Sequence, residues 1–308
     1  MTKTTTNILL LLIAILAGLI TIVGGTFFYI TCCSECGAIA PTEPTMEQVI
    51  IKEPEATAYS FAIDGNGFTY STTDNYNFNV SSHNILMPLS EELTKGVSGL
   101  QRHLQTNESN VVNITGYYTS DEENNTAFPN LGPARANTIK NDLASKGIST
   151  TQINTMGKLM DDMIAKDGTY WGAASFGIEE ESQNANDDLK ALYAKINANP
   201  LILYFNTAET SISLTAVQRQ KVADISRYLD KVNGAKANVV GHTDGTGKAS
   251  TNLRLGQDRA NFAKDYLMKN GIASDKIVAT SKGQTEPIAS NTTEVGKNKN
   301  RRTVITLN

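Results

Sequence analysis

Cysteine is scarce in this 308-residue sequence: there are three, at positions 32, 33 and 36, and none follows. The long remainder of the chain therefore has no disulfide framework. Because no histidine accompanies the cluster, a zinc site is disfavoured there. Thiols that pair between chains, carry an acyl group or have no role are the alternatives that stay open.

The chain also lacks a large excess of positive or negative charge. Charged residues make up 19% of the chain and the net charge is −4, which gives no electrostatic basis for binding nucleic acid. Nucleophile motifs are absent too, and His242 has Asp244 as its single nearby candidate metal ligand. We therefore expect no catalytic residue, no metal and no cofactor, so that the protein is not an enzyme. His242 is interpreted as a residue that fixes its loop.

One long apolar run is present, and it lies near the N-terminus. Residues 8–30 carry no charged side chain and are long enough to cross a bilayer. Lys3 precedes the run and the next basic residue is Lys52, which predicts a cytoplasmic N-terminus. We predict a transmembrane anchor over residues 1–31. A cleaved signal peptide is disfavoured because its apolar core is shorter, and an outer-membrane lipoprotein acylated at Cys32 is a further alternative.

The next segment has the composition of a spacer. Residues 32–58 contain three of the eight prolines, with acidic residues between them. Proline and charge keep such a chain extended and without a core of its own. We predict a flexible linker that carries the remainder away from the membrane.

An internal repeat organises the remainder of the chain. The sequence LGPARANTIKNDLASKGI begins at Leu131, and LGQDRANFAKDYLMKNGI begins at Leu255. Apolar strand-like runs and amphipathic helical patterns surround both copies in the same order. The repeat predicts an α+β protein with two tandem βαβαββ domains, each with its helices packed on one mixed sheet. Their predicted bounds are residues 59–182 and 183–308.

Arg259 is the most informative residue of the second copy. Leu255, Phe262 and Ala263 lie three or four residues from it, which places Arg259 on the helix face directed at the core. A buried arginine is costly unless an acceptor satisfies it, and Asp244, a bound anion or both could do so. One interpretation is a structural ion pair. The other is a pocket for a zwitterion, with its ammonium on Asp244 and its carboxylate on Arg259.

Several separated motifs of residues 198–308 resemble the C-terminal domain of the OmpA-like family, which binds peptidoglycan. These motifs are GHTD at 241–244, Asn252, Leu255, Arg259–Ala260 and Asn300–Arg301–Arg302. The resemblance implies that Asp244 and Arg259 hold the diaminopimelate end of the stem peptide. It also implies that Thr246, Asn252 and Arg301 line the same site. One departure is Gly256, where the family usually has serine.

The first copy differs at the corresponding positions. It reads Gly116-Tyr-Tyr-Thr119, without an acid where the second copy has Asp244, although Asp121 is nearby. Arg135 is retained on its helix. We therefore expect a degenerate OmpA-like domain that kept the fold and lost or changed its ligand.

Together these patterns predict a cell-envelope protein that tethers a membrane to peptidoglycan. Residues 8–30 are its membrane contact, and the C-terminal domains lie in the periplasm. A homodimer, formed through the span or the cysteines, stays open. One alternative is a protein–protein scaffold with structural Asp–Arg pairs. Another is a component similar to the MotB-like stators, which is disfavoured because residues 1–34 contain no Asp or Glu for ion passage.

Overall fold

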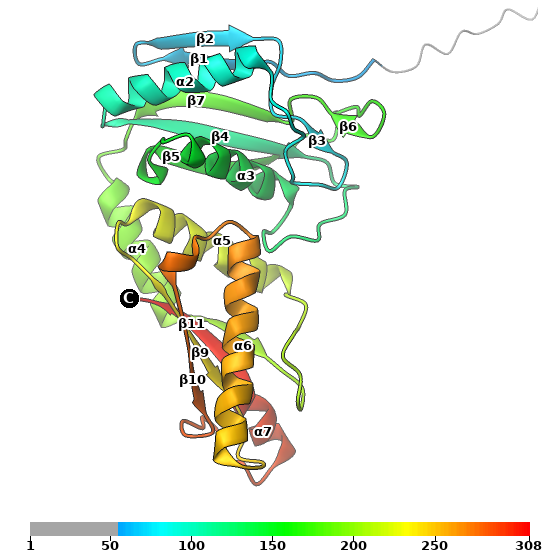
Figure 1. The fold of residues 1–308 in the computed structure, drawn as a ribbon, viewed down its shortest axis with the longest axis vertical. Coiled ribbons are helices and arrows are strands. Elements are labelled where there is room, and N and C mark those ends of the chain that lie inside the picture. Colours follow the sequence, from blue (N-terminus) through cyan, green and yellow to red (C-terminus); the bar gives the residue numbers. More distant parts are fainter. Residues whose placement is uncertain (1–54) are drawn as a thin grey trace, which may run out of the picture. The chain divides into compact units, whose positions relative to one another are not determined.

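A computed structural model describes residues 55–308, which belong to one compact unit (Figure 1). The predicted anchor, and all but the end of the predicted linker, lie outside these residues. Within 55–308, no helix has both the length and the apolar character needed to cross a membrane.

The second half of this unit, residues 183–308, is built on one mixed sheet of order β10-β9-β11-β8. Strands β9 and β10 are parallel, and β11 runs antiparallel to both β9 and β8. The strands are β8 (Leu201–Tyr204), β9 (Ala237–His242), β10 (Ile277–Gly283) and β11 (Arg302–Leu307). The helices are α4 (Ala185–Ala198), α5 (Ala216–Lys231), α6 (Ala249–Lys269) and α7 (Glu294–Asn300), with a short 3-10 turn η2 (Ser274–Lys276).

Helix α6 lies along β9 and β10 at close range (Figure 1). A Cβ atom at Gly241 would lie 1.8 Å from the Gly256 carbonyl oxygen, and one at Gly256 would lie 2.3 Å from the Ser281 hydroxyl. Gly241 has no room for a side chain because the obstructing atom is backbone, whereas at Gly256 the nearest backbone atom, the Gly241 carbonyl oxygen, is 3.0 Å from the added Cβ. Glycine at both positions thus accompanies a close approach of α6 to β9.

The first half, residues 59–182, repeats part of this arrangement. Its three-stranded sheet has the order β5-β4-β7, with β4 (Asn110–Tyr118) parallel to β5 (Ile153–Leu159) and antiparallel to β7 (Ala174–Glu180). Helices α2 (Glu91–Thr106) and α3 (Leu131–Ser145) and the turn η1 (Thr150–Gln152) occur in the same order as α5, α6 and η2. Gly116 approaches Gly132 as Gly241 approaches Gly256: an added Cβ would lie 2.1 Å from the Gly132 carbonyl oxygen.

The edge of the first half differs from the prediction. The strand-like run Tyr59–Ile63, which the repeat predicts as the first strand of this half, lies partly in β1 (Phe61–Gly65), which pairs with β2 (Phe68–Thr72) in a separate hairpin. Strand β3 (Phe78–Asn79) instead pairs with β6 (Thr169–Tyr170). The predicted βαβαββ order is thus interrupted by two small added sheets.

The loop between β4 and α3, residues 119–130, contacts the second half through polar groups. The Asn124 carbonyl accepts a hydrogen bond from Arg219 Nη1 at 2.9 Å. The Ala127 N–H donates to Asn270 Oδ1 at 2.8 Å, and Ala127 is buried in the apolar core of the second half. This loop therefore connects the two halves, through its hydrogen bonds and through Ala127.

Candidate functional site

Arg259 is fully buried on α6, and its guanidinium is surrounded by backbone carbonyls. Nε donates to Glu209 O at 2.9 Å, Nη1 to His242 O at 3.0 Å and Nη2 to Asn206 O at 3.1 Å. The ring of Phe205 lies against it, 5.1 Å from the guanidinium carbon. Burial, with the charge of Arg301 as a second cause, lowers the pKa of Arg259 to about 10. No carboxylate of the described chain forms an ion pair with this cation.

Asp244 is paired with a different arginine. Its Oδ2 accepts from Arg301 Nη1 at 2.8 Å, and both side chains are nearly buried. Its Oδ1 accepts from the Thr246 N–H at 2.9 Å. Burial alone would raise the pKa of Asp244, but the hydrogen bonds from Arg301 and Thr246 outweigh burial and hold that pKa below its usual value. The sequence-based interpretation of a direct Asp244–Arg259 ion pair is therefore wrong, because Asp244 forms its ion pair with Arg301.

Asn252 and Thr246 shape the loop that presents Asp244. The buried Asn252 amide donates to the carbonyls of Asp244 and Thr246, at 3.4 and 3.0 Å, and to the side chain of Gln284. Thr246 is exposed at the rim. The five predicted residues thus gather in one region, with Asn252 below the loop and Thr246 at its surface.

His242 lies under the same loop. Its burial, and then the charge of Arg302, lower the pKa of His242 to about 4, so the ring is neutral at neutral pH. Within the described chain its Nδ1 atom has no hydrogen-bond partner. The residue contributes its carbonyl to Arg259 rather than a titrating group.

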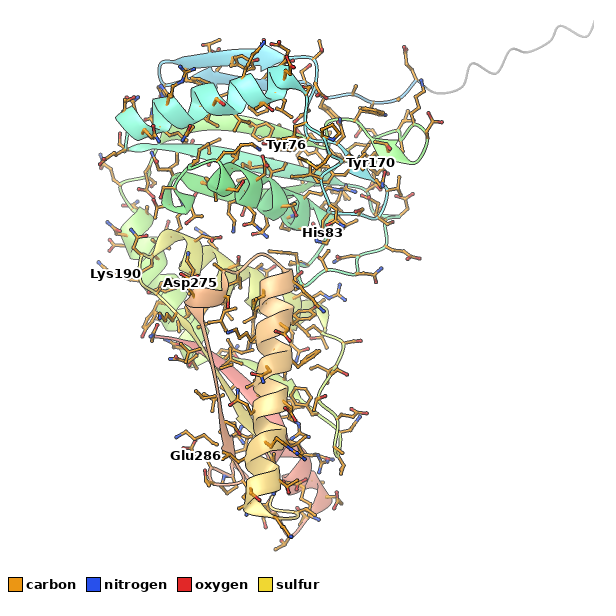
Figure 2. All side chains as sticks on the ribbon, viewed as in Figure 1. Tyr76, His83, Tyr170, Lys190, Asp275 and Glu286 are labelled. Atoms are coloured by element: carbon orange, nitrogen blue, oxygen red, sulfur yellow. The ribbon has the colours of Figure 1, made fainter. Side chains whose placement is uncertain are left out.

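Arg135 on α3 has matching surroundings in the first half. It is fully buried and donates to three carbonyls, from Nε to Ser82 at 3.0 Å, from Nη1 to Tyr117 at 2.7 Å and from Nη2 to Asn79 at 3.4 Å. Phe78 and Tyr170 each place a ring 5.4 Å from the guanidinium carbon. Tyr170 lies at the same end of this half as His83 (Figure 2), whose pKa burial lowers, with the charge of Arg135 as a second cause.

A carboxylate completes the Arg135 site, which is the main difference between the two arginines. Glu122 Oε1 accepts from Arg135 Nη2 at 2.5 Å and from the Ser81 N–H at 2.9 Å. Its Oε2 accepts from Arg135 Nη1 at 3.1 Å and from the Thr119 N–H at 3.0 Å. The Glu122 side chain is only 1% exposed. The position that matches Asp244 is Thr119, as the sequence predicts, whereas Glu122, three residues further on, places its carboxylate against Arg135.

The second half has the same four donor groups at the corresponding residues, namely two guanidinium nitrogens of Arg259 and the backbone N–H groups of Ala208 and Asp244. Ser81 and Ala208, each two residues beyond the carbonyl that accepts from Nη2, both have left-handed backbones, with φ of 59° and 62°. Asp244 occupies the position of Thr119 at the end of the preceding strand. Among residues 55–308, no acceptor is provided for the Ala208 or Asp244 N–H groups. The sequence reasoning missed both backbone donors, and the left-handed Ala208 gives no sequence signal.

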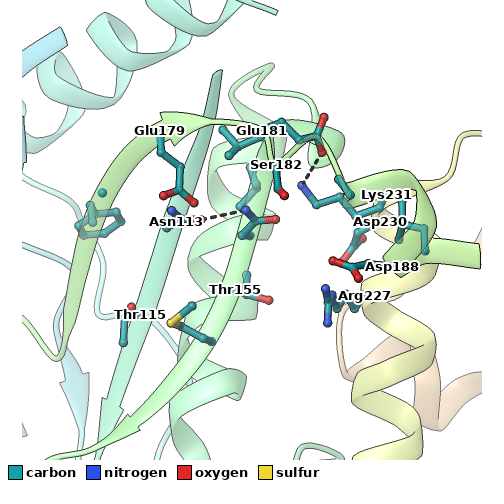
Figure 3. A pocket seen from close by; sticks show the side chains of 18 of the residues that line it. Asn113, Thr115, Thr155, Glu179, Glu181, Ser182, Asp188, Arg227, Asp230 and Lys231 are labelled. Atoms are coloured by element: carbon teal, nitrogen blue, oxygen red, sulfur yellow. Dashed lines mark hydrogen bonds and ion pairs between the residues drawn. The ribbon is translucent and has the colours of Figure 1, made fainter. Parts of the chain in front are cut away.

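A separate cavity of about 760 Å³ lies away from both arginines. Its wall is formed by β4, β5 and β7 of the first half and by α4 and α5 of the second (Figure 3). Asn113 accepts a hydrogen bond from Asn154 there at 2.8 Å, and Lys231 lies 4.0 Å from Glu181. Its size does not make it the candidate site, because none of the five residues predicted from the sequence lines it.

Comparisons with known proteins match the part of the chain that contains Arg259. Residues 204–301 match the model of the OmpA family. The chain is 39% identical over 87 residues to "Peptidoglycan-binding protein ArfA" of Mycobacterium tuberculosis, a match that covers 27% of each protein. It is 35% identical over 98 residues to "Probable lipoprotein YiaD" of Escherichia coli, covering 32% of this chain and 45% of that protein.

Among solved structures, the peptidoglycan-associated lipoprotein of Burkholderia pseudomallei is 25% identical, with a TM-score of 0.32. That match covers 35% of this chain and 89% of the other. The chain thus spans about a quarter to a half of the length of the two curated relatives named here. The second half has a mixed α+β, OmpA-like fold, and its relatives point to the cell envelope.

Proposed function

We propose that residues 183–308 bind peptidoglycan non-covalently through the diaminopimelate end of its stem peptide. Support comes from the OmpA family match over residues 204–301 and from relatives whose names state that they bind, or are associated with, peptidoglycan. The proposal includes no bond-making step. The protein holds its ligand and takes no part in chemistry.

One observation carries the proposal: the Arg259 site has the donors of a carboxylate cradle. A carboxylate offers about four lone-pair sites, and a guanidinium presents two parallel N–H groups to it. In the first half, two guanidinium nitrogens and two backbone N–H groups hold Glu122 in this way. Arg259, Ala208 and Asp244 offer the same set. A ligand carboxylate would stabilise a buried cation whose present partners are all neutral carbonyls.

Asp244 supplies the opposite charge for the ammonium group of the same ligand. Each of its oxygens accepts one hydrogen bond in the structure and has capacity for another. Arg301 keeps Asp244 ionised, Thr246 lies at the rim, and Asn252 holds the loop. These five residues are the proposed binding set. Together they would recognise a zwitterion, a group that diaminopimelate provides.

We propose further that residues 59–182 are a degenerate copy of the same domain. The order β4-α3-η1-β5-β7 corresponds to β9-α6-η2-β10-β11, with the same parallel and antiparallel pairings. Arg135 and Arg259 donate to corresponding carbonyls. The replacement of an external ligand by Glu122 accounts for the degeneracy.

The proposed anchor has support from sequence alone. Residues 8–30 would hold the chain in the cytoplasmic membrane, and 32–58 would link that span to the periplasmic domains. Mass spectrometry of the N-terminus separates the alternatives: an intact Met1 or Thr2 supports the span, whereas an acylated Cys32 places the protein with lipoproteins. Crosslinking of the cysteines would test a homodimer.

Cosedimentation of the full-length protein with diaminopimelate-type sacculi tests the ligand. Arg259→Ala should weaken binding by about 2–5 kcal/mol, because it removes the charged half of the cradle. Arg254→Ala is the matched control, since Arg254 lies exposed on the same helix. Free diaminopimelate should compete with the sacculi and its diamide should not. Equal retention of both variants would refute the cradle, and equal binding to lysine-type sacculi would refute the diaminopimelate specificity.

A further inference from the structure

We propose that the first half contains a carboxylate-binding site of its own, whose resident ligand is the side chain of Glu122. This inference does not depend on what the second half binds. It assigns a ligand class, a small carboxylate, to the Arg135 site of a domain that the sequence predicts to be degenerate. The evidence is the set of contacts around Glu122 and the loop that carries it.

The contacts are those of a bound ligand rather than of a surface ion pair. Each carboxylate oxygen of Glu122 accepts two hydrogen bonds, one from Arg135 and one from a backbone N–H. The side chain of Arg135 is 0% exposed and that of Glu122 is 1% exposed. A buried carboxylate is tolerated only when such donors replace its water, and here every donor is directed at it. One donor comes from Ser81, a non-glycine residue with φ of 59°. A left-handed backbone at such a residue is costly and is often found where a ligand is held.

Glu122 lies in an irregular loop outside the sheet, and its side chain extends from this loop to Arg135. Residues 119–130 lie between β4 and α3 and have no strand or helix of their own. Side chains elsewhere fasten them: Asp161 Oδ1 accepts from the Ser120 N–H at 2.7 Å, and Ser81 Oγ accepts from the Glu123 N–H at 3.0 Å. The loop conformation therefore survives in part without Glu122.

Deletion of the side chain defines the external ligand. Glu122→Ala removes a CH₂ group and a carboxylate, which together have the size and shape of acetate. The four donors would then face a space matched to acetate, with a buried Arg135 cation and no counterion. Acetate should bind there and restore stability by mass action.

Thermal unfolding of the full-length protein tests this, followed by the fluorescence of Trp171. This is the only tryptophan of the chain and is adjacent to Tyr170, so its emission reports on the first half. Glu122→Ala should lower the midpoint by about 10 °C, because one partner of a buried pair is left alone. Sodium acetate at about 0.2 M should return several degrees of that loss, and sodium chloride at equal ionic strength should not. Glu123→Ala, which removes an exposed acid from the neighbouring position, is the matched control.

The double variant Glu122→Ala/Arg135→Ala tests whether acetate acts at this site. It should show no acetate-specific shift, since the guanidinium donors are gone. If Glu122→Ala does not fold in chloride, recovery of folded Trp171 emission on adding acetate supports the site, and no recovery overturns it. Acetate shifts of equal size in the wild type, Glu123→Ala and Glu122→Ala would also overturn it, as would a Glu122→Ala midpoint equal to that of Glu123→Ala.

Discussion

Arg135 and Arg259 are two buried arginines in the same setting, and they differ in one partner. Each is fully buried, donates to three backbone carbonyls and lies against a phenylalanine ring. Glu122 neutralises the first, whereas the second has no carboxylate within the described chain. The first half therefore supplies the carboxylate for its own arginine, whereas the second half leaves the corresponding donors to the ligand that we propose.

The opposite wall of each site differs in the same sense. Asp244 and Arg301 form an ion pair in the second half at 2.8 Å. In the first half Thr119 takes the place of Asp244, and its hydroxyl donates to Asp121 Oδ1 at 2.5 Å and lies 3.2 Å from the Tyr170 hydroxyl. The replacement of Asp244 by Thr119 and the gain of Glu122 are the two differences on which the proposed contrast in zwitterion binding rests.

Removal of each arginine should give the largest difference between the halves. Arg135→Ala leaves Glu122 buried and unpaired, so we expect the first half to lose about 3–5 kcal/mol of unfolding free energy. Arg259→Ala leaves no carboxylate unpaired and should cost the second half clearly less. Urea unfolding, with Trp171 emission for the first half and circular dichroism for both, measures the two losses. Equal losses would mean that the two sites have the same structural role.

The second-largest effect should come from placing Thr119 of the first half at the corresponding position of the second, which should weaken binding to sacculi. Asp244→Thr copies Thr119, removes the partner of Arg301 and the proposed acceptor for ammonium, and should reduce sacculus binding by about 2–3 kcal/mol. Titration of the protein with sacculi measures the effect, and Thr119→Ser serves as the control in the other half. Unchanged affinity in Asp244→Thr would restrict recognition to the carboxylate.

The pH dependence of stability should differ where His242 occupies the position of Tyr117. The pKa of His242 is about 4 in the folded chain, against an ordinary value of 6.5. Between these values the unfolded chain binds a proton and the folded chain does not, so the unfolding free energy falls as the pH is lowered from about 6.5 to 4. The loss should be about 1–3 kcal/mol. It should be smaller in His242→Tyr, as measured by urea unfolding at several pH values. The charged groups nearest the ring, Arg302, Glu286 and Lys282, remain in both proteins.

The smallest effect should come from the left-handed residues that present the backbone donors. Ala208 has φ of 62°, a conformation that glycine adopts without steric cost. Ala208→Gly should therefore raise the unfolding free energy by about 0.5–1 kcal/mol. Ser81→Gly should gain less in the first half, because it also removes the hydroxyl that accepts from the Glu123 N–H. Thermal unfolding of both variants measures the gain. A loss of stability at either position would show that the strain is relieved by side-chain contacts.

Much of the fold and part of the site could be predicted from sequence because the information is local. The helical spacing around Arg259 placed it toward the core, and the structure confirms that position. The amphipathic pattern over residues 214–232 corresponds to α5. The added hairpin β1–β2 could not be predicted, because whether a short apolar run joins the main sheet depends on distant strands. Glu122 was missed because it lies in a loop with a different length from its counterpart.

The sequence by itself determined which residues are charged, which helix faces the core, and that two similar segments occur in one chain. Only the tertiary structure decided which partner each charge has. Asp244 meets Arg301 rather than Arg259, and Arg135 meets Glu122 rather than a ligand. Covalent spacing constrains neighbours along one helix, whereas these contacts depend on loops and strand ends that converge after folding. The energy of a buried charge depends on every donor and acceptor around it, and that set exists only in the folded chain.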